Sequence, residues 1–280
     1  MANAEKLLKR AGLLLTRMER LLAPAAAATD WNHIAFRWRR GQGLQPVAHP
    51  HLIPLESLLC MEPQKQEIVR NTRQFVVGRS ANNVLLWGSR GTGKSSLIKA
   101  VLHGFADRGL RLVEVEKADL IDLPDIVDRF YGRPERFILF CDDLSFEADD
   151  ASYNSLKAVL DGSIAAPPEN VLIYATSNRR HLLPESMREN QETRMVEGEI
   201  HPSEGVEEKI SLSERFGLWL SFYPFNQEEY LRIVDHWLAT LGARTTTDEA
   251  TRAAALQWAL KRGSRSGRVA LQFARDWAGR

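Results

Sequence analysis

The chain is constrained most strongly by a glycine-rich octapeptide that lies between an apolar strand pattern and a helical pattern. Residues 88–95 read Gly-Ser-Arg-Gly-Thr-Gly-Lys-Ser and fit the pattern G-x-x-x-x-G-K-[ST]. Residues 83–87 predict a short buried strand, and residues 95–104 predict a helix. In this context the glycines let the backbone wrap closely, so that successive N–H groups point at phosphate oxygens. A chance match in a chain of this length has odds on the order of 1%, so we predict a phosphate-binding loop rather than a glycine-rich turn without a ligand.

Two side chains at the end of this loop have the chemistry that a bound nucleotide requires. Lys94 is expected to reach the β and γ phosphates, and the Ser95 hydroxyl is expected to coordinate Mg²⁺. The expected nucleotide-binding residues are Gly88, Ser89, Arg90, Gly91, Thr92, Gly93, Lys94, Ser95 and Ser96.

The region around this loop alternates between apolar strand patterns and helical patterns. Further strands are predicted at residues 110–115, 137–141, 171–175 and 218–223. Helices are predicted at residues 64–77, 123–131 and 152–160. Alternating strands and helices with fully apolar strands predict an α/β fold in which a parallel sheet is sandwiched by helices.

Three further helical patterns follow the last strand and predict a small helical lid. They span residues 228–241, 248–262 and 267–277. We therefore divide the chain into an N-terminal helix and connector (1–50), a nucleotide-binding core (51–225) and a helical lid (226–280). At the start of the chain, apolar residues recur at helical spacing over residues 3–22. That helix is expected either to pack on its own domain or to contact a partner.

Two other segments are interpreted as connections. Residues 36–40 read Phe-Arg-Trp-Arg-Arg and precede several glycines and prolines, which predicts a solvated connector with a packed tryptophan. Contact of this basic and aromatic cluster with nucleic acid is the alternative. Residues 183–210 are polar and charged with few apolar anchors, which predicts a long loop.

Carboxylates and an amide follow two of the predicted strands. The apolar run 137–141 ends at Asp142 and Asp143, and the run 171–175 is followed by Thr-Ser-Asn, which ends at Asn178. Because the carboxyl ends of parallel strands meet at one edge of a sheet, we expect these side chains beside the phosphate loop. Asp142 is expected to hold Mg²⁺ through water, Asp143 to orient or deprotonate an attacking water, and Asn178 to bond that water or the γ phosphate. A plain turn is the alternative explanation of each pattern.

Two arginines in the C-terminal half are candidates for stabilising negative charge. Arg215 lies in the sequence Ser-Glu-Arg-Phe-Gly before the last predicted strand, and Arg268 begins the last predicted helix. Either arginine can neutralise the charge that develops on a transferred phosphoryl group. Taken in isolation, each is also explained by a surface ion pair.

Composition limits the class of protein and its partners. Hydrophobic residues make up 44% of the chain and charged residues 26%, which is typical of soluble globular proteins. The net charge of +1 gives no bulk field that favours nucleic acid or an anionic membrane. No apolar stretch approaches the roughly 20 residues that span a bilayer, and the basic residues near the start are unlike a signal peptide. Cys60 and Cys141 have no metal or redox spacing, so we expect a reduced, cytoplasmic setting.

The order of these motifs resembles that of AAA+ ATPases. The resemblance assigns Walker A to Lys94 and Ser95, Walker B to Asp142 and Asp143, sensor 1 to Asn178, an arginine finger to Arg215 and sensor 2 to Arg268. A closer similarity is to a bacterial AAA+ family, domain of unknown function 815. It is carried by residues 82–88, 137–146, 174–181 and 215–219. This resemblance covers the chain from about residue 36 onward and implies ATP as the ligand. The absence of a guanine-reading Asn-Lys-x-Asp pattern agrees with it.

Two departures from the general AAA+ pattern bear on the expected activity. Asp143 stands where glutamate is usual, and its shorter side chain predicts slow turnover. Residues 116–120 lack the aromatic-apolar-glycine loop with which polypeptide-threading members grip their substrate. A threading unfoldase is therefore not expected.

We expect a Mg-ATP-dependent ATPase whose nucleotide state controls its oligomeric form or its grip on an unknown protein partner. An ATP-gated binding switch with little hydrolysis is the second hypothesis, motivated by Asp143. A helicase-loader-like, nucleic-acid-associated ATPase is the third, motivated by the residues around Arg215 and by a modestly basic tail. A small-molecule kinase is disfavoured because it does not need a finger from another subunit. The expected cofactors are ATP and Mg²⁺, and the expected partners include further copies of the chain but no membrane.

Overall fold

The computed structural model of the chain describes residues 29–146, 150–162, 168–180, 182, 194–196, 199–201, 212–243 and 248–280. Within them, seven strands form one sheet in the order β2-β1-β4-β5-β6-β3-β9. The strands are β1 (Ala35–Arg39), β2 (Gly43–Pro46), β3 (Val84–Gly88), β4 (Leu110–Glu114), β5 (Arg136–Cys141), β6 (Val171–Ser177) and β9 (Leu218–Phe222). Adjacent strands pair in parallel, apart from the antiparallel pair of β1 and β2. The predicted α/β fold with a parallel sheet is confirmed.

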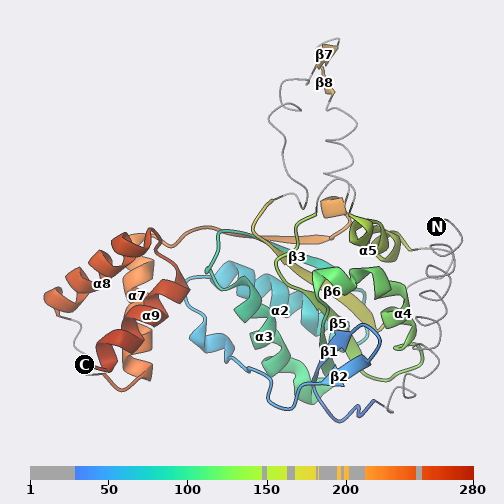
Figure 1. Cartoon of the computed structure of the whole chain (residues 1–280), viewed down its shortest axis with the longest axis horizontal. Coiled ribbons are helices and arrows are strands. Elements are labelled where there is room, and N and C mark those ends of the chain that lie inside the picture. The colour runs from blue at the N-terminus through green and yellow to red at the C-terminus, as the bar shows by residue number, and fades with distance from the viewer. Residues whose placement is uncertain are drawn as a thin grey trace, which may run out of the picture.

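Different helices cover the two faces of this sheet (Figure 1). The core helices are α2 (Glu62–Val76), α3 (Lys94–Phe105), α4 (Leu123–Asp128) and α5 (Ala151–Asp161), with short 3-10 turns η1 (Leu55–Ser57), η2 (Ala106–Arg108) and η3 (Lys117–Asp122). Successive residues of a strand point to opposite faces. In β5, Ile138 and Phe140 therefore pack with α2 and α3, whereas Phe137 and Leu139 pack with α4 and α5. Burial on both faces explains the continuous apolar runs in the sequence.

The first two strands correct the interpretation of residues 36–50 as a connector. Residues of β1 pair with β4, which extends the sheet by two strands on that side. Phe36 and Trp38 are buried in the core. On the other face of β1, Arg37 Nε donates to Glu114 at 2.7 Å, and Arg39 donates to Glu116 at 2.6 Å. The tryptophan is packed as expected, but the arginines already face acidic partners, so this cluster does not favour a nucleic-acid contact.

Two other expected segments are only partly covered by the described residues. The predicted helix at residues 3–22 lies outside them. Within the predicted long loop at 183–210, two short strands, β7 (Arg194–Val196) and β8 (Glu199–His201), pair antiparallel, so this part of the loop forms a hairpin. The other residues of that loop lie outside the described part of the chain.

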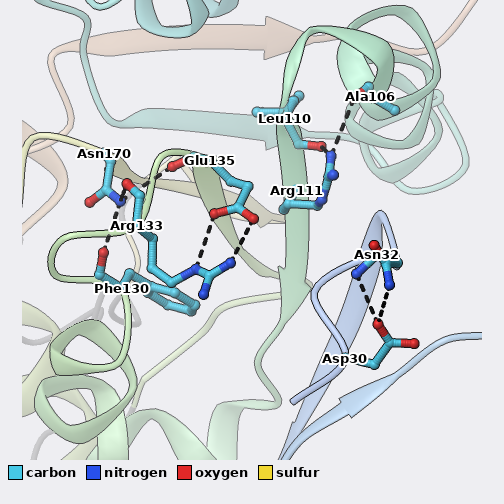
Figure 2. A network of polar contacts seen from close by, with 9 residues as sticks. All are labelled: Asp30, Asn32, Ala106, Leu110, Arg111, Phe130, Arg133, Glu135 and Asn170. Carbon is cyan, nitrogen blue, oxygen red and sulfur yellow. Dashed lines mark hydrogen bonds and ion pairs between the residues drawn. The ribbon is translucent and has the colours of Figure 1, made fainter. Parts of the chain in front are cut away.

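Polar contacts fix the edge of the sheet at which β4, β5 and β6 begin (Figure 2). Asn170 Nδ2 donates toward the carbonyl oxygens of Phe130, Arg133 and Glu135 at 2.9, 3.1 and 3.2 Å. The Arg133 guanidinium donates to both carboxylate oxygens of Glu135, at 3.0 and 2.7 Å. This ion pair holds the pKa of the Glu135 carboxyl below its ordinary value. The amino edge of the sheet is therefore tied together by short polar bonds, while the carboxyl edge carries the residues singled out in the sequence.

Three helices follow the sheet and lie together at one end of the molecule (Figure 1). They are α7 (Gln227–Thr240), α8 (Glu249–Arg262) and α9 (Gly267–Ala278). Asn226, Asp248 and Ser266 cap their first turns by accepting backbone N–H bonds. Among the residues that the structure describes, no helix has the length and apolar character needed to cross a membrane.

Candidate functional site

The glycine-rich loop connects the end of β3 to the start of α3. Gly88 has φ +126°, and a Cβ atom there would lie 2.0 Å from the Phe222 carbonyl oxygen of the neighbouring strand β9. Ser89 N–H donates to the same oxygen at 2.9 Å. Only glycine allows this close approach, so the first turn of the loop is held against β9. Since α3 begins at Lys94, the loop ends at a helix N-terminus, where backbone N–H groups attract anions.

Lys94 lies folded against the loop that precedes it. Its Nζ donates to the carbonyl oxygens of Gly88 and Ser89, each at 2.8 Å, and to Asn178 Oδ1 at 3.3 Å. The side chain is buried. Burial lowers the pKa of the Lys94 ammonium, and the nearby carboxylates of Asp143 and Asp142 oppose this shift. A phosphate group in the cavity would add a negative charge next to this desolvated ammonium and stabilise its charged form.

The ends of β5 and β6 bring together the predicted acidic and amide side chains. Ser95 Oγ donates to Asp142 Oδ1 at 2.7 Å, so the first helical turn contacts the end of β5. Asn178 Nδ2 donates to Asp143 Oδ1. Asp143 has a left-handed backbone conformation with φ +52°. The parallel sheet thus places the two predicted motifs side by side, as the strand order requires.

These residues line one cavity of about 670 Å³, which is within the range of small-molecule sites. Of the predicted residues, its lining includes Arg90, Gly91, Thr92, Gly93, Lys94, Ser95, Ser96, Asp142, Asp143, Asn178 and Arg268. Gly88 and Ser89 are not among the lining residues, although both accept from Lys94 through their carbonyl oxygens. Arg215 is also outside this lining.

The lid closes one side of this cavity. Gly267 N–H, in the first turn of α9, donates to the carbonyl oxygen of Gly91 in the phosphate loop at 2.9 Å. Arg268 is the next residue and lines the cavity. A movement of α9 would therefore stretch or break this hydrogen bond to the phosphate loop.

Arg215 occupies a different position from the other charged candidates. It precedes β9, and its Nε pairs with the Asp161 carboxylate at the end of α5. The ion pair named as the alternative for this residue is therefore present. Arg268, in contrast, lies in the first turn of α9 and lines the cavity.

Several lining residues were missed from the sequence because most are apolar and all come from distant elements. One side of the cavity is lined by segments before α2, before and within α7, and in α9, through Ser57, Leu58, Leu59, Met61, Phe225, Ile233, Trp237 and Leu271. In the sequence, an apolar helix face such as the one that includes Trp237 does not distinguish packing from ligand contact. Lys99 and Thr176 also line the cavity. Lys99 lies one helical turn beyond Ser95, a spacing that indicates its position on the same face of α3.

The donor groups fit a hard cation bound together with phosphates. A hydroxyl from Ser95 and a carboxylate from Asp142 are in contact, and oxygen ligands are what Mg²⁺ prefers. Within the described ranges, no cluster of three or more His, Cys, Asp or Glu side chains is arranged to hold a metal. Mg²⁺ would therefore depend on phosphate oxygens and water for its other ligands, as is usual in sites of this kind.

The fold and this cavity define a P-loop protein of the AAA+ class. The chain belongs to the family Protein of unknown function (DUF815), whose model matches residues 31–280. A comparison with curated proteins gives no match. The family match agrees with the resemblance stated from the sequence motifs.

Solved structures with the same fold include two proteins that act on DNA or bind it. One is RuvB of Thermotoga maritima, a Holliday junction branch migration motor, with a TM-score of 0.52 and 16% identity. The other is the replication initiator DnaA bound to AMPPCP and single-stranded DNA, with a TM-score of 0.51 and 16% identity. Each match covers 79% of this chain and 63% of the other, so this chain spans less than two thirds of their length. Identity this low establishes the fold alone.

Proposed function

We propose that the protein binds Mg-ATP in the cavity between the sheet and the lid, hydrolyses it, and couples the nucleotide state to assembly or to remodelling of a protein partner. One observation carries this proposal: a single cavity combines the phosphate loop, the acidic end of β5, Asn178 and the lid residue Arg268. A nucleotide bound there would contact both the core and the lid, so its presence would change the energy of lid closure.

Each residue has a specific task in the proposed reaction. The N–H groups of residues 89–95 and the ammonium of Lys94 hold the β and γ phosphates. Mg²⁺, when bound, neutralises charge on these phosphates. Asp143 accepts the proton of the attacking water, and Asn178 orients the carboxylate to which it is bonded. Arg268 adds positive charge from the lid side.

Arg215 supports an assembly in which the site is completed by a second copy of the chain. It lies outside its own cavity and pairs with Asp161. In the proposed assembly this arginine faces the γ phosphate held by a neighbouring copy. Stabilisation of that kind contributes a factor of about 10³–10⁵ in related phosphoryl-transfer enzymes.

The test is the rate of Mg-ATP hydrolysis per subunit, measured across a wide range of protein concentration. Lys94→Ala is the blank, because it removes the phosphate-binding ammonium. The rate per subunit is expected to rise with concentration, and Arg215→Ala is expected to remove most of this rise while leaving ATP binding intact. A rate that is independent of concentration and unchanged by Arg215→Ala would refute the assembly model.

A second candidate function is an ATP-gated switch with little hydrolysis. It is favoured by the state of Asp143, whose carboxylate is already bonded to Asn178 and whose backbone is held in the left-handed conformation. An aspartate held this way has less freedom to reach a water than the glutamate usual at this position. Tight ATP binding with no turnover at any concentration would support the switch, whereas turnover by the assembled protein would exclude it.

A further inference from the structure

We propose that Thr176 is a positioning residue that holds both carboxylates at the end of β5 in the geometry for Mg²⁺ and for the attacking water. Thr176 is the penultimate residue of strand β6, is almost fully buried, and lines the cavity. The inference rests on the proposed function, because it gives a role to a residue of the same site.

A single hydroxyl group contacts both acidic residues. Thr176 Oγ1 donates to Asp142 Oδ1 at 2.5 Å and accepts the backbone N–H of Asp143 at 2.8 Å. A hydroxyl has one hydrogen to donate, and here that hydrogen is directed to the Asp142 carboxylate. In the contact with Asp143 the hydroxyl oxygen must accept, because a backbone N–H can only donate.

The Asp142 carboxylate is therefore fixed from two sides. Its Oδ1 accepts from Thr176 on β6 and from Ser95 on α3, at 2.5 and 2.7 Å. Two donors on one oxygen define the orientation of the carboxylate. Partners of this kind, which orient a metal ligand without touching the metal, contribute strongly to metal affinity.

The second contact of Thr176 helps to explain the aspartate at position 143. Asp143 has φ +52°, a conformation that aspartate and asparagine adopt more readily than most other residues. Its N–H bond to Thr176 stabilises this turn, and its carboxylate is then aimed at Asn178. A glutamate in the same turn would have a larger backbone penalty.

The backbone around Thr176 reinforces the same turn. Leu144 N–H donates to the Thr176 carbonyl oxygen at 2.7 Å. Ser177 Oγ donates to the Leu144 carbonyl oxygen at 2.7 Å. Each of the residues 142–144 is therefore hydrogen-bonded to the end of β6. Among these bonds, the one that Thr176 Oγ1 donates to Asp142 contacts an acidic side chain of the site.

The test compares Thr176→Val, which removes only the hydroxyl chemistry, with Thr176→Ser, which keeps it. Thr72→Val is the matched control. Thr72, on α2, is also buried, and it does not line the cavity. Its hydroxyl bonds the hydroxyl of Tyr174, which lies on β6 like Thr176. Thermal unfolding without nucleotide establishes that each variant is folded, and Thr176→Ala replaces Thr176→Val if the latter does not fold.

The first measurement is residue-resolved amide hydrogen exchange in the protein without nucleotide. Thr176→Val is expected to accelerate exchange of the Asp143 amide by about tenfold, because one hydrogen bond is lost. Thr176→Ser and Thr72→Val are expected to leave it unchanged. Equal exchange in Thr176→Val and the unsubstituted protein, or equal acceleration by Thr72→Val, would overturn the inference.

The second measurement is calorimetric ATP binding as a function of Mg²⁺ concentration. Thr176→Val is expected to raise the Mg²⁺ concentration needed to enhance ATP binding by about tenfold or more. ATP binding without Mg²⁺ is expected to stay unchanged, and Thr176→Ser is expected to restore the Mg²⁺ affinity. An unchanged Mg²⁺ dependence, or a loss that is the same with and without Mg²⁺, would overturn the positioning role. If the unsubstituted protein binds no ATP, the proposed function fails, and the exchange data decide separately whether Thr176 orders the turn.

Discussion

Replacement of Gly91 by alanine tests whether the phosphate loop and the lid are in direct contact. Gly91 has φ +74°, and a Cβ atom there would lie 2.9 Å from both Cβ and Oγ of Ser266. That distance is too short for carbon atoms that are not bonded, so Ser266 would have to move. Ser266 is the N-cap of α9, and the next residue, Gly267, donates to the Gly91 carbonyl oxygen. The substitution should therefore displace the start of α9 from the loop.

Two contributions set the size of the effect. A side chain in the left-handed conformation costs about 1–2 kcal/mol. Loss of the bond between Gly267 and Gly91 costs about 1 kcal/mol more. The sum is a decrease of about 2–3 kcal/mol in the free energy of unfolding. Gly41→Ala is the matched control, because Gly41 has φ +78° but no atom within 4 Å of its added Cβ. It should lose only the first contribution.

The assay is urea denaturation of both variants, followed by calorimetric titration with ATP. Gly91→Ala should be about 1 kcal/mol less stable than Gly41→Ala and should bind ATP about fivefold more weakly, since about 1.4 kcal/mol corresponds to a factor of ten. Gly41→Ala should bind ATP like the unsubstituted protein. Equal stability of the two variants together with normal ATP affinity of Gly91→Ala would show that α9 does not rest on the loop as described.

Three further predictions concern the acidic site, the partly buried ion pair of Arg133 and Glu135, and the buried hydroxyl of Tyr174. Asp143→Asn keeps a residue that tolerates the left-handed turn, so Mg-ATP affinity should be retained while hydrolysis falls about 100-fold; single-turnover kinetics check this, and normal turnover would remove Asp143 as the base. Glu135→Gln should lower the free energy of unfolding by about 1 kcal/mol at pH 7. Because Arg133 holds the folded-state pKa of Glu135 below its ordinary value, this contribution is present above the unfolded-state pKa and is lost as pH falls through the folded-state pKa. Denaturation at pH 7 and pH 3 should therefore show a difference that shrinks at low pH, and a constant difference would contradict the ion pair. Tyr174→Phe removes a hydroxyl that contacts Thr72 at 2.9 Å and should cost about 1 kcal/mol in thermal denaturation without changing ATP affinity.

The agreement between sequence and structure is best where the chemistry is local. Glycines followed by Lys94 and Ser95 can be recognised without knowledge of the fold, because backbone geometry and phosphate binding both act within a few residues. The acidic pair at the end of β5 was found because a strand buried on both faces leaves a continuous apolar run. These two motifs were placed in one site by the rule that parallel strands end at one edge.

The errors and omissions come from contacts between distant residues. The sequence of strand β1 predicts a connector, because alternating arginines in a short segment resemble a solvated linker. In the folded chain, Arg37 and Arg39 pair with glutamates some 77 residues away along the sequence. No sequence pattern indicates a role for Thr176, since a threonine at the end of an apolar strand is not distinctive. Its hydroxyl gains significance only when Asp142 is placed beside it.

The sequence by itself determined the class of fold, the phosphate loop and the position of the acidic residues, because these depend on hydrophobic periodicity and on short motifs. Only the tertiary structure decided which apolar residues close the cavity, that Gly267 bonds the phosphate loop, and that Arg215 lies outside its own site. These properties depend on how strands are ordered in the sheet and on where the lid rests. The energies involved come from many contacts between residues far apart in the chain, and no local pattern specifies them.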